Sequence, residues 1–233
     1  MKKINLYRLF LLVFAVLALL YTFTRIDSEN IAQVFYLLRG HLFMVFVSML
    51  IAIIIGISIG IILSRTGYKK FESISMYIVG LGQTIPSLAV LALSMSILGI
   101  GMKPAIFALT IYSVFPIARN TLSGLSSVSS DMIDAAKGLG IPPWKILWQI
   151  EIPNALAVII AGVRTALVIN IGTAALGAVI GAGGLGDQIF KGISFLNPWI
   201  MLSGAIPTAI LALLGDYSLR WLESLLVSEG LKD

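Results

Sequence analysis

The chain has 233 residues, of which 58% are hydrophobic and only 12% are charged. Soluble globular domains carry about 25% charged residues, so the composition excludes a soluble fold and indicates a membrane protein. The net charge of +5 does not indicate nucleic-acid binding, because the basic residues are scattered at the ends of apolar runs, and zero cysteines exclude a disulfide framework, a thiolate metal site and a cysteine nucleophile.

The first apolar stretch runs from Leu9 to Phe23 and follows three basic residues. This order resembles the start of a secretory signal peptide, but no cleavage site with small residues follows the apolar stretch. We therefore predict an uncleaved signal-anchor helix, which together with an outer loop occupies residues 1–30.

Further apolar runs cover residues 42–63, 74–99, 104–120, 154–180 and 199–219. Each run is long enough for a helix to cross the hydrocarbon core, and none alternates between apolar and polar residues as a barrel strand does. We predict an all-α membrane protein with about six transmembrane helices, a transmembrane domain over residues 31–225 and a tail over residues 226–233.

Loop charge sets the direction of these helices, because basic residues concentrate on the cytoplasmic side. With the N-terminus inside, the cytoplasmic segments hold eleven basic residues, namely Lys2, Lys3, Arg8, Arg65, Lys69, Lys70, Arg119, Lys137, Lys145, Arg220 and Lys232. The outer segments hold four, namely Arg25, Arg39, Lys103 and Lys191. This bias predicts that both termini are cytoplasmic and that the polar passage over residues 121–153 faces the cytoplasm.

The middle of the third run is interrupted by Gln83, Thr84 and Pro86. Proline removes a backbone donor and crowds the carbonyl four residues earlier, so we expect a kink there, with the polar side chains bonding the freed carbonyls. A bent, polar helix centre is typical both of a gate in a translocation path and of a packing kink, and both interpretations stay open.

Small residues recur at helical spacing inside two of the runs. Gly56 and Gly60 form a small-xxx-small pair that allows close helix approach. One face of the 154–180 helix carries Gly162, Ala166, Asn170, Thr173, Gly177 and Gly181. Such a face either packs against a neighbouring helix or lines a polar path. Asn170 and Thr173 are candidates for lining a path, because a polar side chain inside the membrane needs a partner or water.

Arg164 is the one charge well inside an apolar run. It either anchors the helix near the cytoplasmic face or takes part in the transport cycle, and its partner is a loop carboxylate such as Asp134 or Glu151, a backbone carbonyl or a lipid headgroup. The spacing of Asp216 and Arg220 predicts an ordinary i, i+4 helix pair. We interpret the single histidine, His41, as an interfacial polar residue rather than a ligand or proton relay.

The run from Gly181 to Gly186 matches the dinucleotide fingerprint G-x-G-x-x-G, but it follows a membrane helix rather than a strand. We therefore expect a glycine-rich turn into a short outer helix from Asp187 to Gly192, with Asp187 as its N-cap. No P-loop, metal-ligand cluster or nucleophile–base pair occurs in the sequence. A proton-coupled transporter usually keeps a carboxylate inside the membrane, whereas nearly every acid here lies in a loop or at the end of an apolar run. Energy for any pumping therefore has to come from another protein.

The passage over residues 121–153 carries the most specific motif. Asp134-Ala135-Ala136 is followed by Gly140, six residues after the aspartate, and then by an amphipathic run to Ile152-Pro153. This spacing resembles the cytoplasmic coupling loop of bacterial ABC-importer permeases. The segments 83–89, 119–121, 161–166, 171–174 and 181–186 narrow the resemblance to the osmoprotectant class, over roughly residues 40–220. The sequence departs from the pattern of this family at two positions, where Asp134 replaces a common Glu and Ile152 replaces Leu. Both changes are mild and leave docking intact.

This resemblance implies a type I ABC-importer permease in the bacterial cytoplasmic (inner) membrane, which carries glycine betaine, carnitine or choline and is not an enzyme. It implies two permease subunits, identical or paralogous, two ABC ATPase subunits and an extracytoplasmic substrate-binding protein. ATP and Mg then belong to the ATPase. The chain itself is expected to hold no cofactor or metal, to contact membrane lipid and to bind no nucleic acid.

The same resemblance assigns an ATPase-docking loop, in which small residues let a short helix sit in a groove and apolar residues supply contact. The docking residues are Asp134, Ala135, Ala136, Gly138, Leu139, Gly140, Ile141, Pro142 and Trp144. The loop is shared with permeases for methionine and other amino-acid-like solutes, which are the main alternative. An ion-coupled secondary transporter is a further alternative, but it predicts inverted repeats and a charged midplane site.

Overall fold

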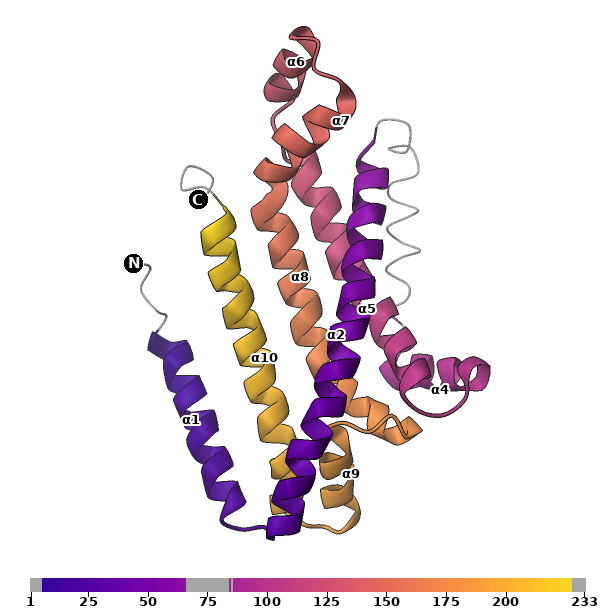
Figure 1. Ribbon diagram of the computed structural model, residues 1–233, viewed down its shortest axis with the longest axis vertical. Coiled ribbons are helices and arrows are strands. Elements are labelled where there is room, and N and C mark those ends of the chain that lie inside the picture. Colours follow the sequence, from indigo (N-terminus) through magenta and orange to yellow (C-terminus); the bar gives the residue numbers. More distant parts are fainter. Residues whose placement is uncertain (1–5, 66–83, 85, 228–233) are drawn as a thin grey trace. The chain divides into compact units, whose positions relative to one another are not determined.

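The computed structural model describes residues 6–65, 84 and 86–227, and the described part contains only helices and their connections. Within it, four helical stretches are long and apolar enough to cross a membrane. They are α2 (Ser28–Ser64), α5 (Met102–Ser126), the stretch Pro143–Ile180, and α10 (Pro198–Leu226). The predicted first and third spans contain the shorter apolar helices α1 (Leu6–Phe23) and α4 (Ser87–Leu98) (Figure 1). The all-α prediction is confirmed.

The helix boundaries differ from the apolar runs wherever a helix continues into polar sequence. α2 begins at Ser28, far ahead of the predicted residue 42, so only residues 24–27 separate it from α1. α5 continues to Ser126, which shortens the polar passage predicted over residues 121–153. The predicted tail begins at the last residue of α10, and residues 228–233 lie outside the described part.

Contacts divide the chain into two compact units, and α2, α5, α8 (Ile152–Ala174) and α10 each contribute one segment to each unit. Unit 1 consists of residues 1–49, 85–110 and 167–215, and unit 2 consists of residues 50–84, 111–166 and 216–233.

The interior of unit 1 contains buried polar side chains that bond between helices. His41 on α2 is fully buried, which corrects its predicted interfacial position. Its Nε2 lies 3.1 Å from the carbonyl oxygen of Ile171 on α8, and since a carbonyl only accepts, Nε2 carries the proton. Ser48 on α2 accepts a 2.9 Å bond from the side-chain amide of Asn170. These bonds fix the rotation of α2 and α8 within this unit.

The glycine-rich segment of unit 1 is a turn, as predicted. The 3₁₀-helix η3 (Ala175–Ile180) ends at Gly181, which has φ +70°, and Gly183 and Gly184 also have positive φ. The short helix α9 (Gly186–Ser194) follows. The predicted N-cap is wrong, because Leu185 occupies that position and Asp187 lies one residue inside the helix. Burial raises the pKa of the Asp187 carboxyl.

Glycines allow the helices of unit 2 to approach closely, so the small-xxx-small prediction is confirmed. A Cβ on Gly56 would lie 2.8 Å from Ile117 of α5, and one on Gly60 would lie 2.9 Å from the carbonyl oxygen of Ala118. Gly162 of α8 approaches Pro116 of α5 in the same way. Leu125, Ala155 and Ile159 form an apolar cluster against which Ile57, Ile61, Leu147 and Ile152 pack. Residues from α2, α5 and α8 are thereby held in one core.

Candidate functional site

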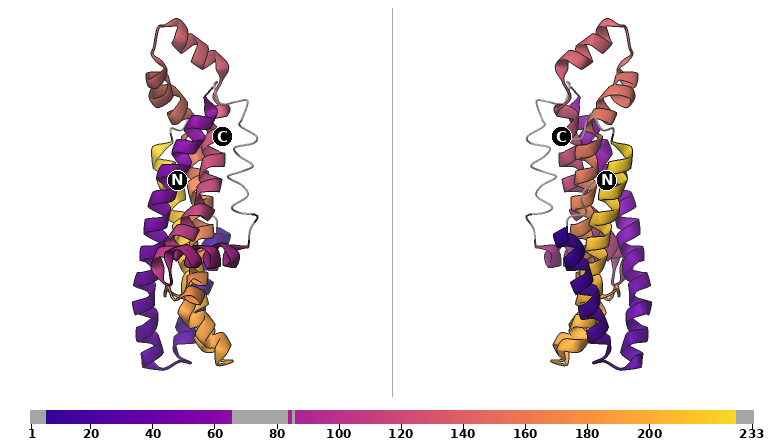
Figure 2. Two further views of the ribbon diagram at one scale, coloured as in Figure 1. Left: turned by 90° about the vertical axis from the view of Figure 1, so that its right-hand side faces the viewer. Right: turned by 90° about the vertical axis from the view of Figure 1, so that its left-hand side faces the viewer.

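The candidate site in unit 2 is a hairpin that joins α5 to α8. It consists of α6 (Ser130–Gly138), a turn, α7 (Pro143–Ile146) and the π-helix η2 (Leu147–Glu151). Figures 1 and 2 show α6 and α7 lying beyond the ends of α5 and α8. Asp131 lies in the first turn of α6 and Lys137 in the last, so both charges complement the helix dipole.

The turn between α6 and α7 depends on Gly140. Its φ of +75° is the left-handed conformation that other residues rarely adopt. The Gly140 N–H donates to the Lys137 carbonyl at 2.9 Å, and the Ile141 N–H donates to the Ala136 carbonyl at 3.1 Å. These two bonds form a Schellman cap, which ends α6 and reverses the chain.

Prolines determine the second limb of the hairpin. Pro142 has ψ 149°, and α7 begins at Pro143, where the missing N–H costs no helical bond. Further along, Pro153 would crowd the Gln149 carbonyl in a regular α-helix. The chain widens into η2 instead, in which the Ile152 N–H reaches the Leu147 carbonyl.

Several large apolar side chains of the hairpin are exposed at its surface. Leu139 at the tip is 80% exposed and Trp144 is 62% exposed, while Trp148 and Met132 are exposed beside them. Ala136 and Ile146 are buried beneath this surface. Exposed aromatic and aliphatic side chains gathered on a short helical hairpin are typical of a protein-binding surface. Trp148 and Met132 were not among the predicted docking residues, although Trp148 lies in the predicted amphipathic run and both lie in the polar passage over residues 121–153.

The remaining predicted docking residues differ in accessibility. Asp134, Ala135, Gly138, Gly140 and Pro142 are exposed, and Ile141 is half-buried. The Asp134 carboxylate accepts a 2.9 Å bond from Lys137, but both side chains are more than 60% exposed, so this ion pair contributes little to stability. The small and polar residues therefore leave a shallow surface around the exposed Leu139 and Trp144.

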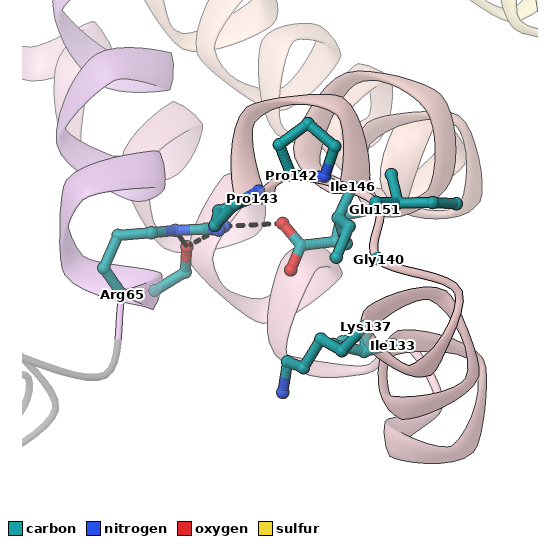
Figure 3. Close-up of a pocket in the computed structure, with 10 residues that line it drawn as sticks. Arg65, Ile133, Lys137, Gly140, Pro142, Pro143, Ile146 and Glu151 are labelled. Atoms are coloured by element: carbon teal, nitrogen blue, oxygen red, sulfur yellow. Dashed lines mark hydrogen bonds and ion pairs between the residues drawn. The ribbon is translucent and has the colours of Figure 1, made fainter.

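A second feature of the hairpin, absent from the predictions, is an ion pair behind it. The Arg65 guanidinium, at the end of α2, lies 2.7 Å from the Glu151 carboxylate, at the end of η2. A cavity of about 640 Å³ lies beside the pair and is lined by Ser64, Ile133, Lys137, Gly140, Ile141, Pro142, Pro143 and Ile146 (Figure 3). The only sequence signal was an acid two residues before Pro153 in an otherwise apolar run.

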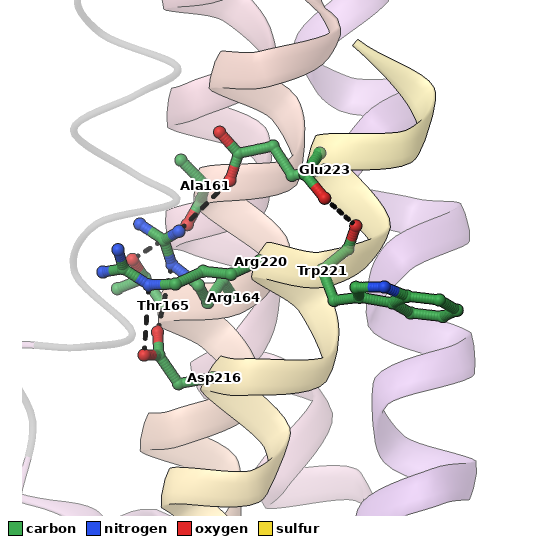
Figure 4. A network of polar contacts seen from close by, with 8 residues as sticks. Ala161, Arg164, Thr165, Asp216, Arg220, Trp221 and Glu223 are labelled. Atoms are coloured by element: carbon green, nitrogen blue, oxygen red, sulfur yellow. Dashed lines mark hydrogen bonds and ion pairs between the residues drawn. The ribbon is translucent and has the colours of Figure 1, made fainter. Parts of the chain in front are cut away.

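Arg164 of α8 lies in a network with α10 in unit 2. Its Nε lies 3.1 Å from Asp216 and its Nη1 lies 3.2 Å from Glu223 (Figure 4). The predicted partners Asp134 and Glu151 are therefore wrong, because α10 continues past the predicted residue 219 and brings a second acid to the same face. The predicted pair of Asp216 and Arg220 is present at 3.3 Å.

The path candidates on α8 lie in different surroundings. Asn170 is fully buried and donates to Ser48, so within unit 1 it bonds two helices rather than lining an open path. Thr173 is half-buried and donates to the carbonyls of Ile169 and Asn170 in its own helix. The small face that includes Gly162 and the buried Ala166 is packed, which favours the packing interpretation for those positions.

The proline-containing segment is only partly described. Gln83 lies outside the described residues, and Thr84 and Pro86 are exposed. Pro86 has ψ 134° and precedes α4, so the backbone at this residue is extended rather than merely kinked. Among the described residues, no three His, Asp or Glu side chains lie close enough to hold a metal ion.

Comparison with known proteins places these features in a family. The family described as "Binding-protein-dependent transport system inner membrane component" matches residues 52–227. The osmoprotectant import permease protein OsmY of Salmonella typhimurium is 48% identical over 187 residues, which cover 80% of this chain and 79% of that protein. The glycine betaine/carnitine/choline transport system permease protein OpuCB of Bacillus subtilis is 38% identical, over 88% of this chain and 94% of that protein.

A solved structure shares the fold. The chain of the inward-facing MetNI methionine ABC transporter superposes with a TM-score of 0.78 at 24% identity, and the match covers 87% of this chain and 100% of that chain. At this identity the likeness concerns the fold alone.

Proposed function

Because this chain belongs to the family of binding-protein-dependent transport system inner membrane components, we propose that it imports a small osmoprotectant such as glycine betaine, carnitine or choline. It is a multi-pass permease subunit of an ABC importer and a transport component rather than an enzyme. The substrate class rests on one observation, namely that relatives at 38–48% identity are named for osmoprotectant, carnitine or choline transport.

The proposed partners supply what a permease lacks, namely ATP hydrolysis and substrate capture. A permease of this kind works with an ATPase and a substrate-binding protein. We assign two ATPase subunits, each holding ATP and Mg, and a second permease that is identical or paralogous. The sequence contains no P-loop of its own.

The hairpin is the surface that the ATPase grips in this proposal. Leu139, Trp144 and Trp148 supply apolar contact area, and the small residues around Gly138 and Gly140 let the tip enter a groove. Closure of the ATPase dimer on ATP then moves the hairpin. The core of unit 2 transmits that movement to α2, α5 and α8, because close-packed helices move as rigid bodies.

The likeness to a methionine transporter does not favour methionine as substrate, since it is a likeness of fold. The nature of the cargo is settled by experiment. The permease, its ATPase and its binding protein are reconstituted in liposomes, and ATP-dependent uptake of labelled glycine betaine, carnitine, choline and methionine is measured.

We expect at least one of the three quaternary ammonium compounds to be imported and to stimulate ATP hydrolysis, with methionine inactive. Uptake of methionine alone would contradict the proposed substrate class while leaving the permease function in place. Liposomes that lack the binding protein provide the control for leakage.

A further inference from the structure

The hairpin is connected to α2 by one charged contact. The Nη2 of Arg65 donates to the Oε2 of Glu151 at 2.7 Å, across 86 residues of sequence. Arg65 immediately follows the last residue of α2, and Glu151 is the last residue of η2. The ion pair therefore joins the end of one long helix to the point where the hairpin enters the next.

Further contacts hold Arg65 in place, and Glu151 is largely buried. The Arg65 guanidinium also donates to Ser64 Oγ at 2.9 Å and, through Nε, to the Ile61 carbonyl at 3.3 Å. The Glu151 side chain is only 10% exposed. A carboxylate buried to this extent is stable only with a charged partner, so separating the pair leaves an uncompensated charge.

The Arg65–Glu151 pair lies beside a cavity and is a directional contact between α2 and the hairpin. Ser64 of α2 and residues of the hairpin such as Ile133 and Ile146 line the same open volume of about 640 Å³. Figure 3 shows Arg65 and Glu151, which also line this volume, pointing toward each other. Ile61, Leu147 and Ile152 pack against one apolar cluster, which holds α2 and the hairpin together, but apolar packing is not directional.

The π-helix locates the pair at a deformable point. A single π-helical turn interrupts the regular α-helical hydrogen-bond ladder and is a place where helices kink. Without a fixed contact, hairpin movement at η2 would be absorbed in this turn. The Arg65–Glu151 pair fixes the last residue of the turn to α2.

We propose that Arg65 and Glu151 are positioning residues that transmit hairpin movement to α2, so that breaking the pair uncouples ATP hydrolysis from transport. This inference rests on the proposed permease function. Neither Arg65 nor Glu151 is one of the proposed docking residues, and the Glu151 side chain is only 10% exposed. The inference therefore predicts defective coupling with ATPase binding intact.

The test measures substrate molecules imported per ATP hydrolysed, together with the amount of ATPase that co-purifies with the permease. Glu151→Gln and Arg65→Gln each remove one charge. We expect normal ATPase binding, continued ATP hydrolysis and a fall of about tenfold in import per ATP, within the usual range of coupling between sites. Arg220→Gln removes a more exposed cation of the same unit and should leave the ratio unchanged.

Two rescue variants separate positioning from general stability. Arg65→Lys keeps the positive charge and should retain most of the coupling. The charge swap Arg65→Glu with Glu151→Arg should recover import per ATP relative to either charge-reversed single variant, as a double-mutant cycle requires for a direct interaction.

Wild-type import is measured first, so the two hypotheses fail separately. A wild-type complex that imports no osmoprotectant overturns the proposed function. A wild-type complex that imports normally, combined with a Glu151→Gln variant of unchanged import per ATP, overturns the coupling role alone. A charge swap that reaches the membrane and binds ATPase but couples no better than the single variants also overturns it.

Discussion

At the residue scale, Gly140 is required by backbone conformation rather than by space. A Cβ at this position meets nothing within 4 Å, yet φ is +75°. An L-residue in this region costs about 1–2 kcal/mol, and a β-branched residue more. Gly140→Val should therefore distort the turn and abolish transport, while the protein still inserts in the membrane. Uptake assays with immunoblots of membrane fractions measure both effects.

Gly138→Ala is the matched control for this prediction. Gly138 is also open to solvent, but it lies inside α6 and needs no positive φ. Alanine favours the helix by up to about 1 kcal/mol over glycine and adds only one methyl group to the docking surface, so this variant should retain most of the transport activity. Normal uptake by Gly140→Val would contradict the docking role of the turn.

Gly60 illustrates the opposite case, in which space is the constraint. A Cβ there would lie 2.5 Å from the Thr121 Cβ and 2.9 Å from the Ala118 carbonyl oxygen. Gly60→Ala should separate α2 from α5 and destabilise the protein by about 1–3 kcal/mol, the usual cost of overpacking. Thermal unfolding of the purified protein in detergent measures the change.

Gly172→Ala tests whether the loss of a helical glycine by itself has any effect. Gly172 lies in α8, is exposed, and a Cβ there meets nothing within 4 Å. The substitution should leave the melting temperature unchanged or slightly raised. Equal melting temperatures for Gly60→Ala and Gly172→Ala would contradict close packing at Gly60.

At the element scale, Arg164 connects α8 to α10 through two acids, whereas Arg220 pairs with one acid in its own helix. Arg164→Ala removes the guanidinium that pairs with both Asp216 and Glu223, whose side chains are 22% and 31% exposed. We expect the free energy of unfolding to fall by about 1–3 kcal/mol, which is less than for a fully buried pair because the two acids are partly exposed. Transport or assembly should decline with it.

Arg220→Ala is the comparison, since it removes only an exposed i, i+4 pair worth about 0.2–0.5 kcal/mol. Uptake and melting temperature should stay near wild type. Small and equal effects of the two substitutions would exclude a structural or transport role for Arg164.

The sequence predicted those element-scale features that depend on short spacings. The i, i+4 spacing of Asp216 and Arg220 requires only a helix, and the glycine-rich run from Gly181 to Gly186 forms a turn because of its own backbone freedom. The partners of Arg164 could not be predicted in this way. They depend on how far α10 extends and how it is rotated against α8, which residues distant in sequence determine.

Long-range contacts also explain the other errors. His41 looked interfacial because the apolar run begins beside it, but α2 extends thirteen residues before it, from Ser28 to Gly40. That extension places the imidazole beside the Ile171 carbonyl inside unit 1. Glu151 was read as a loop carboxylate and a possible partner of Arg164, because nothing in its neighbourhood reveals that Arg65, 86 positions earlier, lies within hydrogen-bond distance.

At the scale of the whole molecule, the orientation in the membrane decides whether the hairpin meets an ATPase. The eleven-to-four distribution of basic residues predicts the hairpin inside and the turn after α9 outside. Leu139 at the hairpin tip is 80% exposed and Leu196 after α9 is 90% exposed. Because the chain has no cysteine, Leu139→Cys and Leu196→Cys each introduce a single thiol.

In right-side-out spheroplasts that produce the permease without its ATPase, a membrane-impermeant maleimide should label Leu196→Cys at once and Leu139→Cys only after permeabilisation. Permeabilised cells are the control, since both thiols must then react. Labelling of Leu139→Cys in sealed spheroplasts would put the hairpin on the outer face. A cytoplasmic ATPase could not then reach Trp144 and Trp148, and the Arg65–Glu151 pair would have no movement to transmit. The permease mechanism therefore depends on the direction of this one hairpin.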